Sequence, residues 1–216
     1  MKKTITVLLV VALVSASSVS ADSFGSGFGS LQIATTSGMG SGHLMGVLGL
    51  ADATSFGGIF TYGLSKNTDG RIKLGLFDGN GGSGTDLFFG ADFKYNFISK
   101  SELQNGPFDM AGGGFFEYYD SDYVSVWSIG GQYIGSYPIE MENKSMLTPY
   151  GRVNVRIESV TVDFNTPGLS DYSESNLEVG LNAGVKWGVN QNFDLYGEFQ
   201  LDGNDGIFFG IDFRVM

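Results

Sequence analysis

The residues of this chain alternate between apolar and polar over long stretches, and this period of two most restricts its fold. Residues 177–189 place Leu, Val, Leu, Ala, Val, Trp and Val at odd positions, and mainly Gly, Glu, Asn and Lys at even ones. Residues 87–97 and 207–215 repeat the pattern. Because successive side chains of a β-strand point to opposite faces, the pattern predicts strands with one wholly apolar face.

The alternating runs predict about ten antiparallel strands, with a range of roughly 8–12. Turn-forming clusters such as residues 78–84 and 202–206 separate them, and the prolines lie in turns or at strand ends. The predicted strands are 43–51, 56–65, 71–78, 86–98, 107–119, 123–137, 148–162, 175–189, 192–201 and 205–215. Most are close to the roughly 9–11 residues that cross a bilayer as a tilted strand.

The first residues predict export. Lys2 and Lys3 precede an apolar run over residues 5–14, and Val19-Ser20-Ala21 is a small-residue cleavage site. This is the layout of a cleaved secretory signal peptide, and the apolar run is too short to span a membrane. The predicted organisation is a signal peptide (1–21), a Gly/Ser-rich N-terminal segment (22–42) that forms either a strand or an irregular segment, and a barrel (43–216).

Composition excludes several classes of protein. The 216 residues include no Cys, 16% charged residues and a net charge of −11. The lack of Cys excludes zinc–thiolate and disulfide scaffolds, and the acidic balance leaves no basic face for nucleic acid. No later apolar stretch is long enough for a transmembrane helix, so a membrane location requires a closed barrel.

The distribution of charge separates a membrane barrel from a soluble one. If the last strand ends in the periplasm, the charges within the predicted strands fall on the polar face, which lines the lumen of a transmembrane barrel. The predicted lumen-lining charges are Arg71, Lys73, Asp92, Lys94, Asp109, Glu117, Arg152, Arg156, Glu158, Glu178, Lys186, Asp194, Glu198, Asp212 and Arg214. Their near balance predicts a packed, ion-paired interior, since wide aqueous pores need roughly 16 strands or more.

The remaining charged residues are distributed differently between the two predicted rims. Lys66, Lys100 and Lys144 fall in periplasmic turns, whereas the predicted outer loops carry acids without Lys or Arg. These outer acids are Asp52, Asp78, Asp86, Asp120, Asp122, Asp163, Asp171, Glu174, Asp202 and Asp205. Among them, Asp78, Asp86, Asp202 and Asp205 are weak candidates for holding a divalent cation.

No catalytic residue and no cofactor is predicted. The single histidine, His43, lies at the predicted periplasmic start of the first strand. Hydrolases of barrel type pair a histidine with Ser or Asp near the outer rim, so His43 is interpreted as a turn or interface residue.

The C-terminal part of the chain carries a family resemblance. Residues 180–187 (GLNAGVKW), a Gln191-Asn192 turn and residues 195–199 (LYGEF) look like a penultimate hairpin, and residues 210–215 look like a closing strand. They resemble the small outer-membrane β-barrel superfamily, the OmpA- and OmpX-like barrels of Gram-negative bacteria. The resemblance implies an all-β fold, a transmembrane up-and-down antiparallel barrel in the outer membrane.

The expected function is that of a non-enzymatic outer-membrane barrel with a structural or surface-interaction role. The expected partners are outer-membrane lipid, lipopolysaccharide and the barrel-insertion machinery, with a monomeric chain. Two alternatives stay open at this stage. One is a narrow cation-preferring porin, and the other is a secreted soluble ligand-binding β-barrel with an apolar interior.

Overall fold

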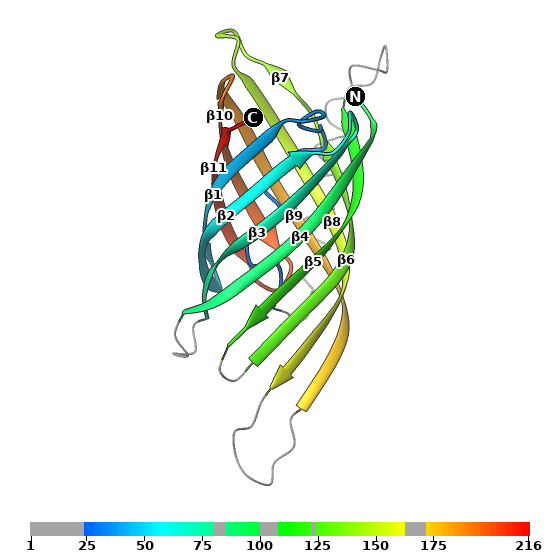
Figure 1. Cartoon of the computed structure of the whole chain (residues 1–216), viewed down its shortest axis with the longest axis vertical. Helices are drawn as coiled ribbons and strands as arrows, with labels where there is room; N and C mark the ends of the chain where they lie inside the picture. The colour runs from blue at the N-terminus through cyan, green and yellow to red at the C-terminus, as the bar shows by residue number, and fades with distance from the viewer. Residues whose placement is uncertain (1–23, 80–84, 100–107, 122–123, 163–171) are drawn as a thin grey trace, which may run out of the picture.

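The strands close into an antiparallel barrel (Figure 1). The computed structural model describes residues 24–79, 85–99, 108–121, 124–162 and 172–216. The wall consists of β1 (Gly42–Ala51), β2 (Ala53–Gly63), β3 (Thr68–Gly79), β4 (Thr85–Ile98), β5 (Asp109–Asp120), β6 (Val124–Ser136), β8 (Met146–Val162), β9 (Tyr172–Asn190), β10 (Phe193–Leu201) and β11 (Gly206–Arg214). The two-residue β7 (Ile139–Glu140) pairs with β8 beside the wall.

Closure depends on two pairings. β6 pairs with β8 across the short β7, and β1 pairs with β11, with Leu48 opposite Phe209. Every other wall strand pairs with its neighbours in sequence, so the predicted up-and-down barrel of about ten strands is confirmed. Predicted and observed strand ends differ by up to three residues. For example, β9 begins at Tyr172, before the predicted start at residue 175. It extends because its pairing with β8 continues as far as Val162.

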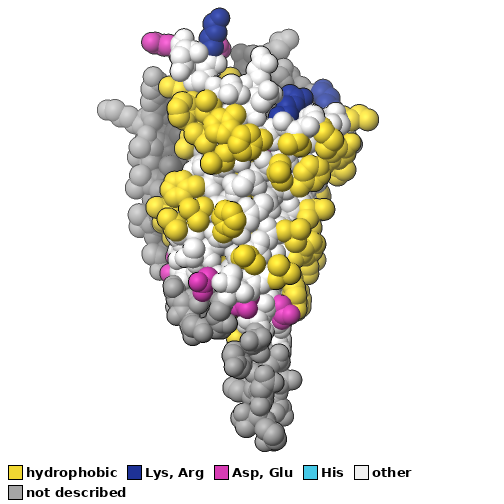
Figure 2. Space-filling view, turned by 60° about the vertical axis from the view of Figure 1, so that its left-hand side comes forward, with side chains coloured by type: hydrophobic (Ala, Val, Ile, Leu, Met, Phe, Trp, Pro, Cys, Tyr) yellow, Lys and Arg dark blue, Asp and Glu magenta, His cyan; other side chains and the backbone are white. Residues whose placement is uncertain are grey.

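Apolar side chains cover the outside of the wall, and polar ones line the inside. On β11, Phe209 is 47% and Phe213 50% exposed, whereas the intervening Asp212 is buried. Figure 2 shows apolar side chains over the flank between the two rims, and charged side chains gathered at the rims. This surface belongs to a transmembrane barrel. It does not fit the predicted alternative of a soluble barrel with an apolar interior and a polar exterior.

The two rims differ in height and composition. The C-terminal rim holds Met216, the start of β1 and the connections at residues 63–68 and 190–193. The opposite rim holds the connections at residues 51–53, 120–124 and 201–206, and there β8 and β9 extend beyond their neighbours (Figure 1). Among the described residues, no helix has the length and hydropathy to cross a bilayer.

The Gly/Ser-rich N-terminal segment contributes to the inside of the barrel rather than to its wall. Its last residue, Gly42, begins β1, while its described part from residue 24 to 41 contains no strand. Residues 26–32 are all buried. The lumen is therefore filled by a segment of main chain as well as by side chains of the wall.

Candidate functional site: a plug segment in the lumen

An irregular segment runs through the lumen from one rim to the other. We call residues 24–37 the plug segment. At the opposite rim, the Phe24 N–H donates to Glu158 Oε1 at 2.8 Å. At the C-terminal rim, the Ser37 N–H donates to both carboxylate oxygens of Asp69, at 3.0 and 3.1 Å. The plug segment is thus held at both ends by carboxylates of the wall.

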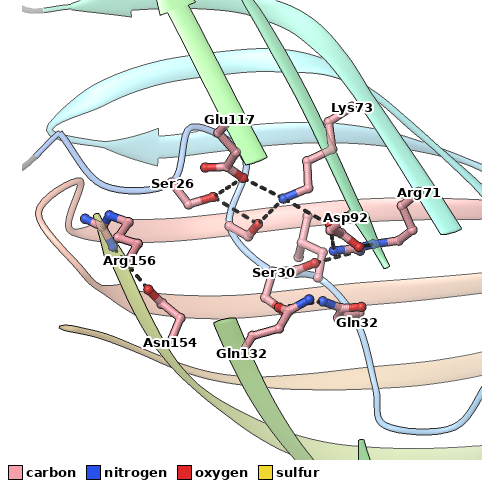
Figure 3. A network of polar contacts seen from close by, with 12 residues as sticks. Ser26, Ser30, Gln32, Arg71, Lys73, Asp92, Glu117, Gln132, Asn154 and Arg156 are labelled. Carbon is pink, nitrogen blue, oxygen red and sulfur yellow. Dashed lines mark hydrogen bonds and ion pairs between the residues drawn. The ribbon is translucent and has the colours of Figure 1, made fainter. Parts of the chain in front are cut away.

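The opposite-rim end of the plug segment is fixed through Ser26. Its N–H donates to Asp202 Oδ1 at 3.3 Å, and its hydroxyl donates to Glu117 Oε1 at 2.9 Å (Figure 3). Its carbonyl oxygen accepts from Gln200 Nε2 at 2.9 Å and from Asn204 Nδ2 at 3.2 Å. One small residue therefore forms hydrogen bonds with four side chains of β5, β10 and the β10–β11 turn.

Phe28 is the apolar anchor of the plug segment. Its side chain is 0% exposed, and its ring meets Phe88 edge-on with centroids 4.7 Å apart. Gly57 and Gly75, which are paired across β2 and β3, lie against the same ring. A Cβ on either glycine would overlap the Phe28 ring, so the wall lacks side chains where the plug segment needs room.

Glu198 holds the middle of the plug segment. Its Oε1 accepts from the Ser30 N–H at 2.6 Å and its Oε2 from the Leu31 N–H at 2.7 Å. The Tyr150 hydroxyl and Asn182 Nδ2 donate to the same carboxylate, at 2.7 and 2.8 Å. Leu31 has a φ of 42°, a left-handed conformation that is unfavourable for residues other than Gly. Successive N–H groups directed at one anion compensate for this local cost.

Basic wall residues bind carbonyl oxygens of the plug segment while paired with wall acids. Arg71 donates two bonds of 2.7 Å to Asp92 and a third, of 2.8 Å, to the Ser30 carbonyl oxygen (Figure 3). Lys73 Nζ lies 2.7 Å from Glu117 Oε1 and 3.5 Å from Asp92. Charge-assisted bonds of this kind are about twice as strong as neutral ones, and they join β3, β4 and β5 to the plug segment.

The same principle operates nearer the C-terminal rim. Lys94 Nζ donates to the carbonyl oxygens of Ile33 and Thr35, both at 2.8 Å, and lies 3.3 Å from Asp69. The Thr35 hydroxyl donates to Asp109 Oδ2 at 3.2 Å. Here, as at Ser30, a wall base binds carbonyl oxygens of the plug segment, and a wall acid accepts a hydrogen bond from it.

A tight turn separates the plug segment from β1. Gly38 and Gly40 have φ values of 87° and 79°, which favour glycine, and the Ser41 N–H donates to the Gly38 carbonyl oxygen at 3.1 Å. The Gly40 N–H donates to the Gly63 carbonyl oxygen at 2.9 Å. The chain therefore reverses at the C-terminal rim, where lumen and wall join.

Most of the residues predicted to line the lumen are buried inside it. Lys186 and Asp194 form a partly exposed pair of 2.8 Å near the C-terminal rim, and Arg214 is exposed at the end of β11. The buried members of the predicted set are Arg71, Lys73, Asp92, Lys94, Asp109, Glu117, Arg152, Arg156, Glu158, Glu178, Glu198 and Asp212. Arg214 is the last residue of β11, and it donates to the Met216 carbonyl oxygen at 3.3 Å and to Ser41 Oγ at 3.2 Å, which places it at the mouth of the lumen.

Two further carboxylates belong to the lumen. Asp69 and Asp202 are 1% and 0% exposed, although Asp202 was predicted to lie in an outer loop. The β10–β11 turn folds inward, which brings Asp202 to Ser26 and to 3.6 Å from Arg156. Burial raises the pKa of Asp202 to about 7, although Arg156 and Arg152 act in the other direction.

The buried charges are therefore unequal in number. Nine buried acids stand against five buried bases among the described residues. The predicted near balance does not hold among the buried residues, because Asp69 and Asp202 add to the acids, whereas Lys186, Asp194 and Arg214 lie at the mouth and are not buried. The acids are Asp69, Asp92, Asp109, Glu117, Glu158, Glu178, Glu198, Asp202 and Asp212, and the bases are Arg71, Lys73, Lys94, Arg152 and Arg156.

The candidate cation ligands do not form a site. Asp86 accepts from the Tyr119 hydroxyl at 2.9 Å, and Asp205 accepts from the Asp202 N–H at 2.9 Å, while Asp78 is exposed on β3. In the part of the chain that the structure describes, no three His, Cys, Asp or Glu side chains are placed to hold a metal ion together.

His43 lies at the C-terminal rim, where its Nδ1 is 3.1 Å from Asp212 Oδ2. The rim positions Lys100, Asp122, Asp163 and Asp171 lie outside the described residues.

Among the comparisons with known proteins, only the search of solved structures finds proteins similar to this chain. No family profile and no curated protein matches the chain. The N-terminal β-barrel domain of OprF from Pseudomonas aeruginosa is 15% identical, with a TM-score of 0.40, and the match covers 82% of this chain and 98% of that domain. The COG4313 outer membrane channel from Pseudomonas putida F1 is 11% identical, with a TM-score of 0.35, over 84% of this chain and 97% of that one.

Proposed function

We propose that this chain is a non-enzymatic outer-membrane β-barrel whose resting lumen is sealed, and that its role is structural or surface-interacting. The observation that carries the proposal is the plug segment, which occupies the lumen from Phe24 to Ser37 and bonds to the wall along its length. A porin that conducts at rest would need this volume to be free.

The surface supports an outer-membrane location. An exterior of half-exposed Leu, Ile, Val and aromatic side chains would be unstable in water, whereas hydrocarbon solvates it. The C-terminal rim would face the periplasm and the opposite rim the outside. In this location a monomeric barrel would contact outer-membrane lipid, lipopolysaccharide and the barrel-insertion machinery.

A surface-interaction role is favoured by the extension of β8 and β9. Residues 172–180 of β9 pair with β8 on one side, and the described residues provide no partner strand on the other, because β10 pairing ends at Leu181. An exposed strand edge is a template for adding a strand from another chain. Glu174 lies on this edge, so an extended segment with basic residues would suit it.

Two measurements on the purified full chain test the proposal. Unboiled protein from the membrane fraction should migrate differently on a gel from boiled protein, as a stable integral barrel does. In planar bilayers, the same preparation should show no steady conductance. Protein recovered in soluble form would contradict the membrane location, and a steady conductance would contradict the sealed lumen.

A further inference from the structure

We propose that the plug segment is a gate, and that its withdrawal opens a passage that conducts small cations in preference to anions. This inference rests on the proposed function as a membrane-spanning barrel. It adds a second, conducting state to the sealed one.

The first argument is that the volume occupied by the plug segment would become a passage through the lumen if the segment left. An extended polypeptide occupies a cross-section of roughly 5 Å by 10 Å, the spacings between strands and between packed sheets. The wall side chains leave room for the main chain of the plug segment between its contacts with Glu158 at one rim and Asp69 at the other. Gly57 and Gly75 widen it beside Phe28. A continuous path would thus exist without rearrangement of the wall.

The second argument is the charge that the plug segment leaves behind. Residues 24–42 contain no charged side chain, so withdrawal does not change the excess of buried wall acids over bases. Plug-segment N–H and hydroxyl groups now donate hydrogen bonds to six of those acids, namely Asp69, Asp109, Glu117, Glu158, Glu198 and Asp202. Once these donors leave, water and mobile cations are the natural replacements, because a lumen whose acids outnumber its bases attracts cations.

The third argument is that the plug segment is attached so that it can move. It lies outside the strand ladder, and its connection to β1 is the turn containing Gly38 and Gly40. Rotation at that turn would draw the segment out at the C-terminal rim and leave the pairing of β1 with β2 and β11 unchanged. Its attachments to the wall are side-chain contacts, which can be exchanged for contacts with water.

The experiment records single channels in planar bilayers under a KCl gradient, using full-length chains. The opened variant carries Phe28→Ala and Leu31→Ala, which remove apolar anchors of the plug segment and leave every wall charge in place. A matched control carries Phe209→Ala and Ile211→Ala on the lipid-facing side of β11. The locked variant adds Ala34→Cys and Ser136→Cys, because the Ala34 N–H lies 3.1 Å from Ser136 Oγ and the chain has no other Cys.

The opened variant should show openings at least about tenfold more often than the wild type, with a reversal potential shifted toward that of K⁺. Oxidation of the locked form should abolish the openings and a reductant should restore them, while the control stays as silent as the wild type. The gate is refuted if the folded opened variant conducts no more than the wild type, if its openings favour Cl⁻, or if the lock has no effect.

A result that contradicts the proposed sealed lumen can be distinguished from one that contradicts the gate. It would appear as steady conductance in the wild type, and the lock would then decide whether that current passes where the plug segment lies. If the double variant does not show heat-modifiable migration, Phe28→Ala alone provides the same test, judged by the same lock and the same reversal potential.

Discussion

Glu198 on β10 accepts a 2.7 Å hydrogen bond from the backbone N–H of Leu31, a residue 167 positions earlier in the chain. The last hairpin of the wall therefore holds the first described segment. Because β10 pairs with β11, and β11 closes the barrel against β1, this contact joins the plug segment to the hairpin that closes the wall.

Glu198→Gln should loosen the plug segment. Hydrogen bonds to a charged group contribute about 1.5–3 kcal/mol, so weakening this carboxylate should raise the exposure of the plug segment by roughly tenfold or more. The measurement is the rate at which a cysteine introduced at the buried Ala34 reacts with a water-soluble thiol reagent. Asp194→Asn, which disturbs the Lys186 pair instead, is the control and should leave the rate nearly unchanged. Equal rates for the two variants would contradict the role assigned to Glu198.

Phe28→Ala should destabilise the barrel by about 3–5 kcal/mol, the usual cost of deleting a buried aromatic ring. The readout is the urea concentration at which the folded gel band is lost in detergent. Phe209→Ala removes a ring that contacts lipid, and it should cost much less in the same assay. A Phe28 variant as stable as the Phe209 variant would show that the ring does not anchor the plug segment.

Gly75→Ala should disturb the fold where Gly46→Ala does not. A Cβ at Gly75 would overlap the Phe28 ring and the Phe56 carbonyl oxygen, whereas a Cβ at Gly46 meets nothing within 4 Å. Overpacking of this kind costs about 1–3 kcal/mol. Thermal loss of the folded band measures both variants, and similar melting of the two would refute the close approach at Gly75.

Val179→Lys or Phe209→Lys should block assembly in the membrane. Both side chains lie on the outer face of the wall, where Lys near the middle of a bilayer costs roughly 2–4 kcal/mol. The yield of heat-modifiable protein in the membrane fraction gives the result. Asn143→Lys, in the exposed connection after β7, is the control. Normal assembly of both wall variants would mean that the apolar face does not contact lipid.

Stability should decrease as the pH rises from the ordinary pKa of Asp202, 3.8, to its folded pKa of about 7. The folded pKa of Asp202 is about 7 and its ordinary value is 3.8, so between these values the folded state binds more protons than the unfolded one. The stabilisation is complete below about pH 4 and is lost as the pH approaches 7, with an upper size of about 4 kcal/mol. Urea unfolding at about pH 5 and about pH 8 measures it. Asp202→Asn should remove this part of the pH dependence, and an unchanged dependence in that variant would assign it to other groups.

The wall could be predicted from the sequence because its signal is local. The alternation in stretches such as residues 177–189 and 207–215 predicts which side chains face lipid. Clusters rich in Gly and Asp predict the turns. The burial of Arg71, Asp92 and Glu117 follows directly from their place on the polar face. Strand ends were less exact because pairing with a neighbour extends β9 beyond its alternating part.

The plug segment could not be predicted in the same way, because its contacts with the rest of the barrel connect positions 30 to 178 residues apart. Its irregular backbone has no period, and Gly25, Gly27 and Gly29 resemble a linker in sequence. One signal was available. An uncharged segment can offer its N–H groups to the acids of the wall and its carbonyl oxygens to the bases. Glu198 accepts from the Ser30 N–H, and Arg71 donates to the Ser30 carbonyl oxygen.

The course of the plug segment also places Phe24, the first described residue, and Met216 at opposite rims. The strand β1 nevertheless starts at the same rim as Met216. In the docked state, an epitope joined directly ahead of Phe24 would emerge on one side of the membrane and an epitope joined after Met216 on the other. Antibodies applied to intact cells would bind only the epitope on the cell surface, which gives the orientation of the barrel. Loss of binding to the epitope ahead of Phe24 would indicate that the plug segment had withdrawn from the lumen.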